Sequence, residues 1–203
     1  MSTRPYRQHR RLESQAETRR RIVEATAALH EEVGPAATTI SGIAERAGVQ
    51  RLTVYRHFPD ERALFEACSA HWSAAHPAPD PATWAGVRDP RRRLETALTA
   101  LYDYYRRGAT MLEKVLRDSQ TEPVLAEVVA PFQTYLDGLA ADLTVGWSPD
   151  PKGRPMLRAA IGHALEFETW RSLALRGLGA EDAARLMAGM ASASVRARAS
   201  ARR

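Results

Sequence analysis

The residues of this sequence best suited to a chemical role lie in the segment TISGIAERAGVQRLTVYRHF, positions 39–58. Arg51 can donate two hydrogen bonds to guanine O6 and N7, and Leu52 can contact a thymine methyl group. The hydroxyl groups of Thr53 and Tyr55 suit phosphate oxygens. These residue types at this spacing indicate recognition of double-stranded DNA.

Two short helices must position these side chains. The pattern predicts an eight-residue helix that Thr39 caps and that ends before Gly48, followed by a second helix over residues 50–58. A glycine turn sets two such helices at a steep angle, so the second can enter the major groove. Val54 and Phe58 are four positions apart and are expected to face the core. This leaves the following side chains on the DNA side: Arg51, Leu52, Thr53, Tyr55 and His57.

The rest of the chain is also predicted to be helical, so the fold class is all-α. Caps, breakers and apolar spacing predict helices over residues 17–33, 61–72, 90–107, 110–118, 123–143, 156–176 and 180–195. The proline- and glycine-rich segments 74–90 and 145–155 are predicted loops, and no alternating pattern indicates a strand.

The segment Thr18–Phe65 resembles the N-terminal domain of the tetracycline-repressor (TetR) family of bacterial transcriptional regulators. The resemblance rests on Thr38-Thr39-Ile40, Ile43-Ala44, Ala47-Gly48-Val49, Thr53-Val54-Tyr55, His57-Phe58 and Leu64-Phe65. It implies a homodimeric regulator, mostly a repressor in this family, that leaves an inverted-repeat operator when a small-molecule inducer binds. It also implies a phosphate contact by His57. With Thr39 and Gln50 added, the DNA-binding residues are then Thr39, Gln50, Arg51, Leu52, Thr53, Tyr55 and His57.

Three positions depart from the family pattern. Gly42 stands in mid-helix where the family often has an acidic residue, and Gln50 replaces the usual serine or threonine cap. Glu61 stands where a lysine usually contacts phosphate, and a carboxylate would repel phosphate. Whether Arg62 takes over that contact stays open.

The resemblance divides the chain into two domains. Residues 1–72 comprise a basic arm (1–16), the helix-turn-helix and the start of a linking helix, and residues 73–203 form a helical domain for ligand binding and dimerisation. Apolar residues on several faces of 156–176 and small residues after position 180 favour a helical bundle between two chains. The predicted dimer contacts are Leu157, Ile161, Leu165, Ala184 and Ala188. Burial of these faces within one subunit is the alternative.

An apolar cavity with a few polar groups is the usual character of a small-molecule site. The candidate lining residues of such a pocket in the second domain are Tyr102, Tyr105, Met111, Phe132, Trp147, His163, Glu166 and Trp170. Ordinary core positions are the alternative for each of them, because aromatic and methionine residues at helical spacing commonly form core.

Positive charge gathers at the two ends of the chain. Residues 1–21 carry seven arginines against Glu13 and Glu17, a net charge of +5 that equals the excess of the whole chain. Residues 190–203 add four arginines, so residues 22–189 sum to −4. The arm either reaches a minor groove or raises nonspecific affinity by releasing counterions, and we favour the second interpretation.

Composition sets the outer limits. The 203 residues are 44% hydrophobic and 26% charged, without a long uncharged apolar run, which argues against wholesale disorder and a membrane span. One cysteine, Cys68, excludes an internal disulfide and a zinc cluster, and the first 21 residues lack the apolar segment of a signal peptide. We expect a cytoplasmic protein with no metal and no cofactor.

Two other classes of function compete with a specific regulator. A small helical enzyme is one, although the only candidate trio is His163, Glu166 and Glu168 and no familiar catalytic or metal motif occurs. A nonspecific DNA-binding protein that uses only its basic ends is the other. Neither Arg51 nor Leu52 would then discriminate between bases.

Overall fold

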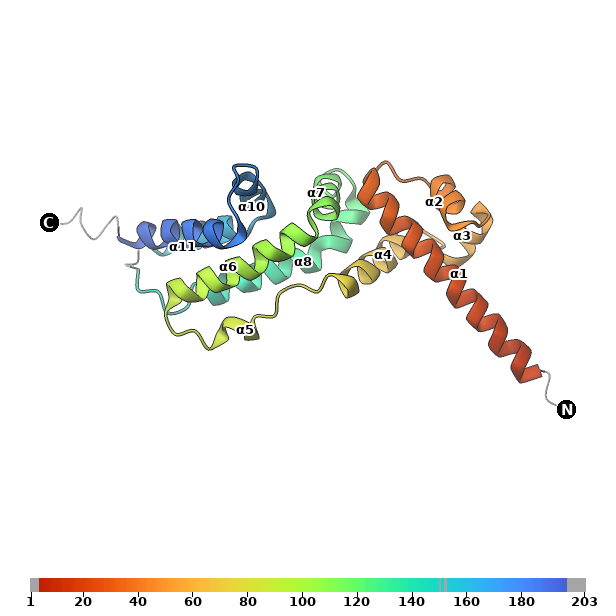
Figure 1. The fold of residues 1–203 in the computed structure, drawn as a ribbon, viewed down its shortest axis with the longest axis horizontal. Coiled ribbons are helices and arrows are strands. Elements are labelled where there is room, and N and C mark those ends of the chain that lie inside the picture. The colour runs from red at the N-terminus through yellow and green to blue at the C-terminus, as the bar shows by residue number, and fades with distance from the viewer. Residues whose placement is uncertain (1–3, 150, 152, 197–203) are drawn as a thin grey trace. The chain divides into compact units, whose positions relative to one another are not determined.

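The computed structural model describes residues 4–149, 151 and 153–196, and this part of the chain contains helices and no strand (Figure 1). The helices are α1 (Arg4–Glu32), α2 (Ile40–Ala47), α3 (Arg51–His57), α4 (Glu61–Ala75), α5 (Ala82–Ala85), α6 (Pro90–Arg107), α7 (Ala109–Asp118), α8 (Pro123–Leu143), α9 (Arg154–Leu165), α10 (Phe167–Ala174) and α11 (Ala180–Arg196). The predicted all-α class is confirmed. Among the described helices, none has the length and apolar character needed to cross a membrane.

The helices form two compact units. The first comprises Met1–Ala75 with Thr110–Val129, and the second comprises His76–Ala109 with Ala130–Arg203. The first boundary between these units lies after Ala75. The segment 110–129, however, groups with the N-terminal unit, because side chains of α7 bind the end of α1 and the turn that follows it. The basic tail at 198–203 lies outside the described residues.

Helix α1 is much longer than predicted, since it begins at Arg4 and runs for 29 residues. The predicted start of the first helix at residue 17 is therefore wrong, because residues 4–16 of the basic arm are also helical. Nothing in this stretch breaks a helix: Pro5 stands at the second position, where proline is tolerated, and no glycine follows until Gly34.

The core of the first unit joins α1, α2, α3 and α4. Apolar side chains at three- and four-residue spacing on α1 and α2 meet Val54, Phe58 and Leu64, and the buried cluster is Ile22, Val23, Ala25, Ile43, Ala44, Ala47, Val54, Phe58 and Leu64. Burial of one of the valine, leucine, isoleucine or phenylalanine side chains stabilises the fold by about 1.5–3 kcal/mol. This packing fixes the directions of the short helices α2 and α3.

Helix α7 holds the turn between α1 and α2. Lys114 Nζ donates to the carbonyl oxygens of Glu31 and Glu32, the second at 2.8 Å. The buried Asp118 carboxylate accepts the Ala36 N–H at 3.0 Å and pairs with Arg117. Burial would raise the pKa of Asp118, but Arg117 and the Ala36 N–H outweigh it and lower the pKa. The charged side chains of α7 thus hold the end of α1 and the following turn by binding their backbone groups.

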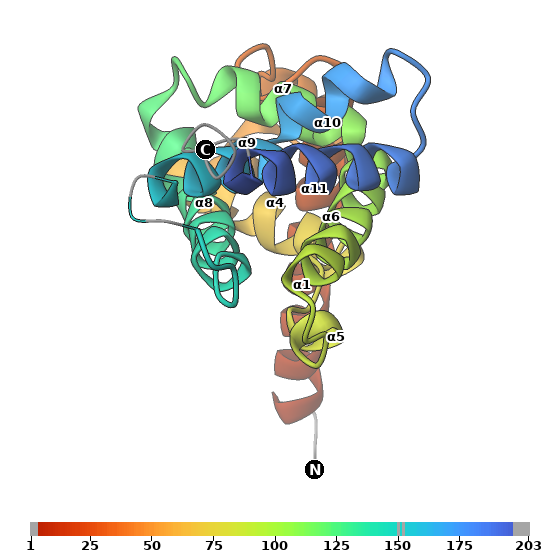
Figure 2. The ribbon, with the colours of Figure 1, turned by 90° about the vertical axis from the view of Figure 1, so that its left-hand side faces the viewer.

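In the second unit, α11 lies against α6 and α9 (Figure 2). The buried Tyr102 hydroxyl donates to the Ala164 carbonyl at 2.8 Å, and the Tyr105 hydroxyl donates to the Leu165 carbonyl at 2.6 Å. These carbonyls end α9, and Glu166 follows with extended backbone angles (φ −70°, ψ 141°). The prediction of one helix over 156–176 is therefore wrong: two helices, α9 and α10, meet at Glu166.

The predicted loop 74–90 also contains a helical turn. Helix α5 is four residues long and holds the buried Trp84. Asp80 starts this turn, since its carboxylate accepts the Ala82 N–H at 2.9 Å. The indole ring gives this turn an apolar anchor in the second unit.

The buried His30 leads to a prediction about pH. Its side chain on α1 is 3% exposed, its Nδ1 lies 3.5 Å from Cys68 Sγ, and its Nε2 has no hydrogen-bond partner. Burial lowers the pKa of His30 to about 4 from its ordinary 6.5, against an opposing effect of Asp118. The unfolded chain therefore binds this proton more readily than the folded chain does.

The stability that neutral His30 contributes should be fully present above pH 6.5 and should be lost as the pH falls toward 4, by about 3 kcal/mol in total. Urea unfolding of the wild type and of His30→Leu across this window measures the effect. The variant should lack this part of the pH dependence. Equal slopes in both proteins would contradict the assignment.

Candidate nucleic-acid interface

The first helix of the candidate interface is closed at both ends by the predicted groups. The Thr39 side chain accepts the Gly42 N–H at 3.1 Å, and this cap begins α2. At the other end Gly48 adopts a left-handed conformation (φ 63°, ψ 41°), and its N–H donates to Ala44 and Glu45 carbonyls. A non-glycine residue adopts this conformation at a cost, so the sharp turn depends on Gly48.

The second helix, α3, lacks a side-chain cap. Gln50 precedes it with extended backbone angles and makes no capping hydrogen bond, as its departure from the family pattern suggests. Val54 and Phe58 are both buried, at the spacing that the sequence analysis predicts for the core face. Packing of these two side chains holds α3 in place.

The opposite face of α3 is open to solvent. Leu52 is 77% exposed and Tyr55 is 46% exposed, so Tyr55 is not a core aromatic residue. Arg51 is exposed as well, and Thr53 and His57 are partly buried. Arg56, which is not among the predicted DNA-binding residues, is exposed four positions after Leu52 on the same face. This spacing was a sufficient signal to include it.

Cationic groups lie together at the end of α3. The Arg19 guanidinium of α1 stands 4.5 Å from the centre of the Phe58 ring, a cation–π contact. Burial, Arg56 and Arg19 lower the pKa of His57, and its buried Nε2 has no hydrogen-bond partner. Arg19 and Arg56 thus place positive charge beside the His57 ring at the end of α3.

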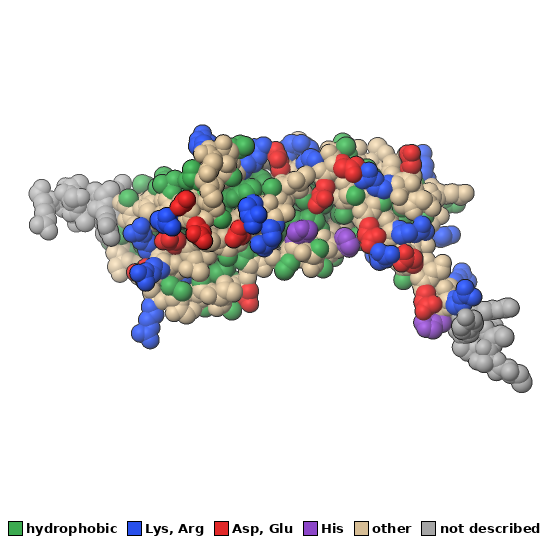
Figure 3. All heavy atoms as spheres, in the orientation of Figure 1, with side chains coloured by type: hydrophobic (Ala, Val, Ile, Leu, Met, Phe, Trp, Pro, Cys, Tyr) green, Lys and Arg blue, Asp and Glu red, His purple; other side chains and the backbone are tan. Residues whose placement is uncertain are grey.

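Two further arginines fix α2 against α1. The Arg46 guanidinium forms a two-pronged ion pair with Glu32, at 2.5 and 2.7 Å. Arg21 Nη1 donates to the Ala47 carbonyl at 3.2 Å, at the C-terminal end of α2. These arginines therefore have structural partners inside the unit. Elsewhere, on the face in Figure 3, basic and acidic side chains are interspersed.

The start of α4 provides no evident phosphate-binding cation. Asp60 caps this helix by accepting the Ala63 N–H at 2.8 Å, and Glu61 follows in the first turn. Arg62 forms an ion pair with Glu127 of α8. Arg62 is thus paired with a carboxylate of the first unit.

The residues proposed for a ligand pocket do not come together as one lining. Tyr102 and Tyr105 are fully buried and use their hydroxyl groups at the end of α9, and their neighbours Phe132 and Trp170 belong to the same aromatic cluster. Met111 is buried in the first unit. His163 and Glu166 are exposed and lie 3.7 Å apart. The aromatic residues that are regularly spaced along α6 and α10 therefore form part of the core of the second unit.

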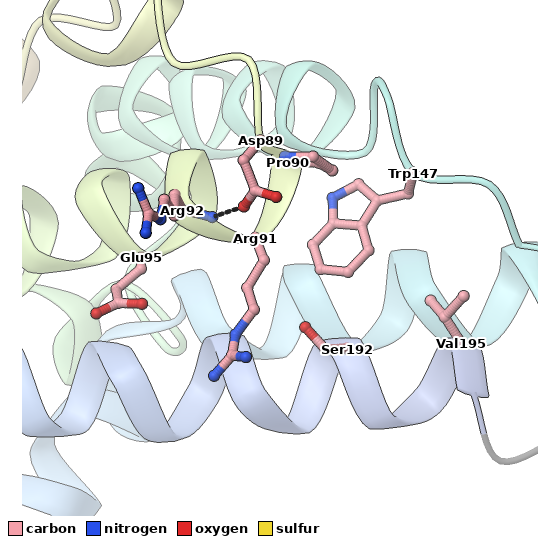
Figure 4. A pocket seen from close by; sticks show the side chains of 8 residues that line it. All are labelled: Asp89, Pro90, Arg91, Arg92, Glu95, Trp147, Ser192 and Val195. Atoms are coloured by element: carbon pink, nitrogen blue, oxygen red, sulfur yellow. Dashed lines mark hydrogen bonds between the residues drawn. The ribbon is translucent and has the colours of Figure 1, made fainter.

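Of those candidates, Trp147 lines a groove in the second unit. The groove has a volume of about 470 Å³ and is lined by Asp89, Pro90, Arg91, Arg92, Glu95, Trp147, Ser192 and Val195. Figure 4 shows the indole ring facing this space opposite Ser192 and Val195 of α11, with the Arg91 side chain reaching toward α11. Its walls carry both signs of charge beside an aromatic ring.

The predicted dimer contacts are buried within the single chain. Their side chains at Leu157, Ile161, Leu165, Ala184 and Ala188 have almost no exposed surface, so they cannot provide the surface for a partner. The apolar side chains that α11 does expose are Leu186 and Met190, 45% and 56% exposed, beside Gly189 and Ala193. Apolar spacing in the sequence does not distinguish a face covered by its own chain from one covered by another.

This chain is similar in sequence and in fold to known proteins. Residues 22–68 match the family of bacterial regulatory proteins described as the tetR family. An uncharacterized HTH-type transcriptional regulator of Mycobacterium bovis is 33% identical over 131 residues, which cover 64% of this chain and 67% of that protein. The chain belongs to the TetR family.

Two further similarities agree with this membership. The TetR-family chain is 30% identical over 130 residues to the HTH-type transcriptional repressor KstR of Mycolicibacterium smegmatis, which covers 64% of this chain and 56% of KstR. A TetR-like transcriptional regulator from Rhodococcus sp. RHA1 has the same fold with a TM-score of 0.62, 16% identity and coverage of 87% and 94% of the two chains. The protein is thus a DNA-binding transcriptional regulator, and its family is not a family of enzymes.

Two glycines of the TetR-family helix-turn-helix should respond oppositely to alanine. A Cβ at Gly42 would lie 3.4 Å from Thr39 Oγ1 and 3.8 Å from Leu29 Cδ1, which is ordinary contact in a helix. Gly42→Ala should therefore stabilise the fold by about 0.5–1 kcal/mol. Gly48→Ala should destabilise it by about 1 kcal/mol, because Gly48 has a φ of 63°. Urea unfolding measures both, and changes of the same sign would contradict this assignment.

Proposed function

We propose that this protein is a homodimeric repressor that binds an inverted-repeat operator, with one α3 helix in each half-site. The observation that carries the proposal is the exposed face of α3, which presents Arg51, Leu52 and Tyr55 while Val54 and Phe58 are buried. A helix held in this way can enter a major groove with its polar face toward the bases. Repression is supported by the name of the similar KstR repressor.

The proposal assigns different tasks to the exposed groups. Arg51 reads a guanine, and Leu52 contacts a thymine methyl group. Thr39, Gln50, Thr53, Tyr55 and His57 contact phosphates or adjoin them at the ends of the two helices. Arg56 joins this set because its charge lies on the same exposed face as Leu52.

The dimer is proposed to form through α11. One face of this helix carries Leu186, Gly189, Met190 and Ala193, which are spaced by three, one and three residues. The exposed apolar side chains supply area, and the small residues permit close approach of a second helix. A two-fold axis through this contact would place two α3 helices on the two halves of an inverted repeat.

A small-molecule inducer completes the proposal. The groove beside Trp147 and Arg91 offers an aromatic wall and charged groups in one place, the kind of mixed lining that orients a ligand. Binding there would release DNA if the ligand favours a dimer whose two α3 helices are wrongly spaced for the operator.

The reading of bases can be separated from phosphate contact by two substitutions. Arg51→Ala should relax the preference at one base pair by about 1–3 kcal/mol, because its guanine contact is lost. Tyr55→Phe should weaken binding to every sequence by about 1 kcal/mol. Affinities for a preferred duplex and for its single-base variants measure both effects.

Arg62→Gln is the control, since Arg62 pairs with Glu127 and should leave both affinity and base preference unchanged. An unchanged preference in Arg51→Ala would show that α3 is oriented differently on DNA. The proposal of α3 as the reading helix would fall if none of these substitutions altered binding.

Dimerisation through α11 has its own test. Met190→Glu places a carboxylate in the proposed apolar contact, where its desolvation is unfavourable, and should convert the protein to a monomer. Leu52→Glu introduces the same charge at an equally apolar exposed site of the first unit and should leave the dimer intact. Sedimentation measures the mass, and a dimeric Met190→Glu protein would refute this interface.

A further inference from the structure

The N-terminal part of α1 has two faces with different charge. Helix α1 shows its first buried side chains at Ile22 and Val23, so the described turns before Thr18 extend beyond the core. Residues 8–17 are all exposed. At a rise of 1.5 Å per residue, residues 4–17 span about 21 Å. This is the length of about six base pairs of DNA.

One face of this extension carries paired charges. His9 lies 3.7 Å from Glu13, and Arg20 forms ion pairs with Glu17 at 2.7 Å and with Glu24 at 2.5 Å. Glu13, Glu17, Arg20 and Glu24 are spaced by four, three and four residues, so they occupy one face. Both carboxylates of the first 21 residues lie on it.

The other face carries positive charge and no carboxylate. Arg11, Gln15, Thr18 and Ile22 have the same four, three, four spacing, and Ile22 is buried in the core of the first unit. The face of Arg11 is therefore the face that packs against the helix-turn-helix further along α1. In the sequence, Arg4 and Arg7 precede Arg11 by seven and four positions, which continues this spacing.

The basic face leads directly from the DNA-reading elements. Arg19 contacts the Phe58 ring at the end of α3, and Arg21 binds the Ala47 carbonyl beside the Gly48 turn. The extension thus begins at the edge of the helix-turn-helix. The cations around His57 continue into it without an intervening acid on this face.

We propose that this face of α1, with Arg11 at its centre, binds DNA phosphates outside the bases that α3 reads. The inference rests on the proposed function for the position of DNA. Charge complementarity selects the phosphate backbone, since the exposed side chains of Arg11 and Gln15 carry N–H donors for phosphate oxygens. The extension lengthens the contact along the backbone and adds no base preference.

Two substitutions that each remove one positive charge test the proposal in the full chain. Arg11→Gln changes the basic face, and Arg20→Gln changes the opposite face. Glutamine favours helix, so α1 should persist in both, which circular dichroism checks. The probe is a duplex that carries the preferred site and extends beyond it at both ends.

Each lost phosphate contact lowers the slope of log affinity against log salt by about 0.9. Arg11→Gln removes one such contact from each subunit of the proposed dimer and should therefore lower the slope by about 1.8, whereas Arg20→Gln should retain the wild-type slope. When the duplex is trimmed to the site itself, the contacts of α1 are absent in both proteins, so the wild type and Arg11→Gln should have the same slope. Equal slopes for the two variants, or a decrease that persists on the trimmed duplex, would overturn the proposal.

A further measurement distinguishes failure of the proposal for α1 from failure of the proposed function. If the wild type has no preferred sequence, the same slopes are measured on a long duplex of mixed sequence. A face-dependent decrease there would support phosphate binding by α1 without base recognition by α3. An unchanged slope in Arg11→Gln on that duplex would reject the proposal for α1 as well.

Discussion

The interface depends on the burial of Val54 and Phe58. Helix α3 has only seven residues and no side-chain cap at its start, and a helix of that length is unstable in isolation. Its exposed face therefore has a fixed direction only because two apolar side chains on the other face pack into the core of the first unit. Loss of that packing would remove every proposed base contact at once, although no contacting residue had changed.

The same reasoning extends to the turn before α2. Gly34 has a φ of 94°, and a Cβ there would lie 2.8 Å from the Asp118 carboxylate and from Arg117. The turn is thus shaped by the close approach of α7, because Asp118 accepts the Ala36 N–H of the turn and Lys114 binds the carbonyl of Glu32 at the end of α1. Through these charged contacts, helix α7 helps to fix the position of α2, and α2 packs against α3.

Local signals in the sequence were enough to predict the helix-turn-helix. Thr39, Gly48 and Val54 each act within four residues of their position, through a cap, a left-handed turn and one helical face. The break at Glu166 could not be predicted in this way. It depends on the hydroxyl groups of Tyr102 and Tyr105, which are separated from the carbonyls of Ala164 and Leu165 by about sixty positions in the chain.

The misassigned residues share a related cause. Leu157, Ile161 and Ala188 have the spacing of an apolar helix face, but spacing does not identify the element that covers the face. The partners of the arginines are also distant in the sequence: Arg62 forms an ion pair with Glu127, and Arg19 forms a cation–π contact with Phe58. By contrast, Arg56 was within reach of sequence reasoning, since it follows Leu52 by one helical turn.

Selection of bound fragments from a random duplex pool, at two salt concentrations, tests the central claim most directly. A dimer whose α3 helices read bases should enrich one inverted repeat at both concentrations, with half-sites about one helical turn apart. Enrichment of no sequence, together with a steep loss of affinity at the higher salt concentration, would contradict base recognition by α3 and indicate purely electrostatic binding.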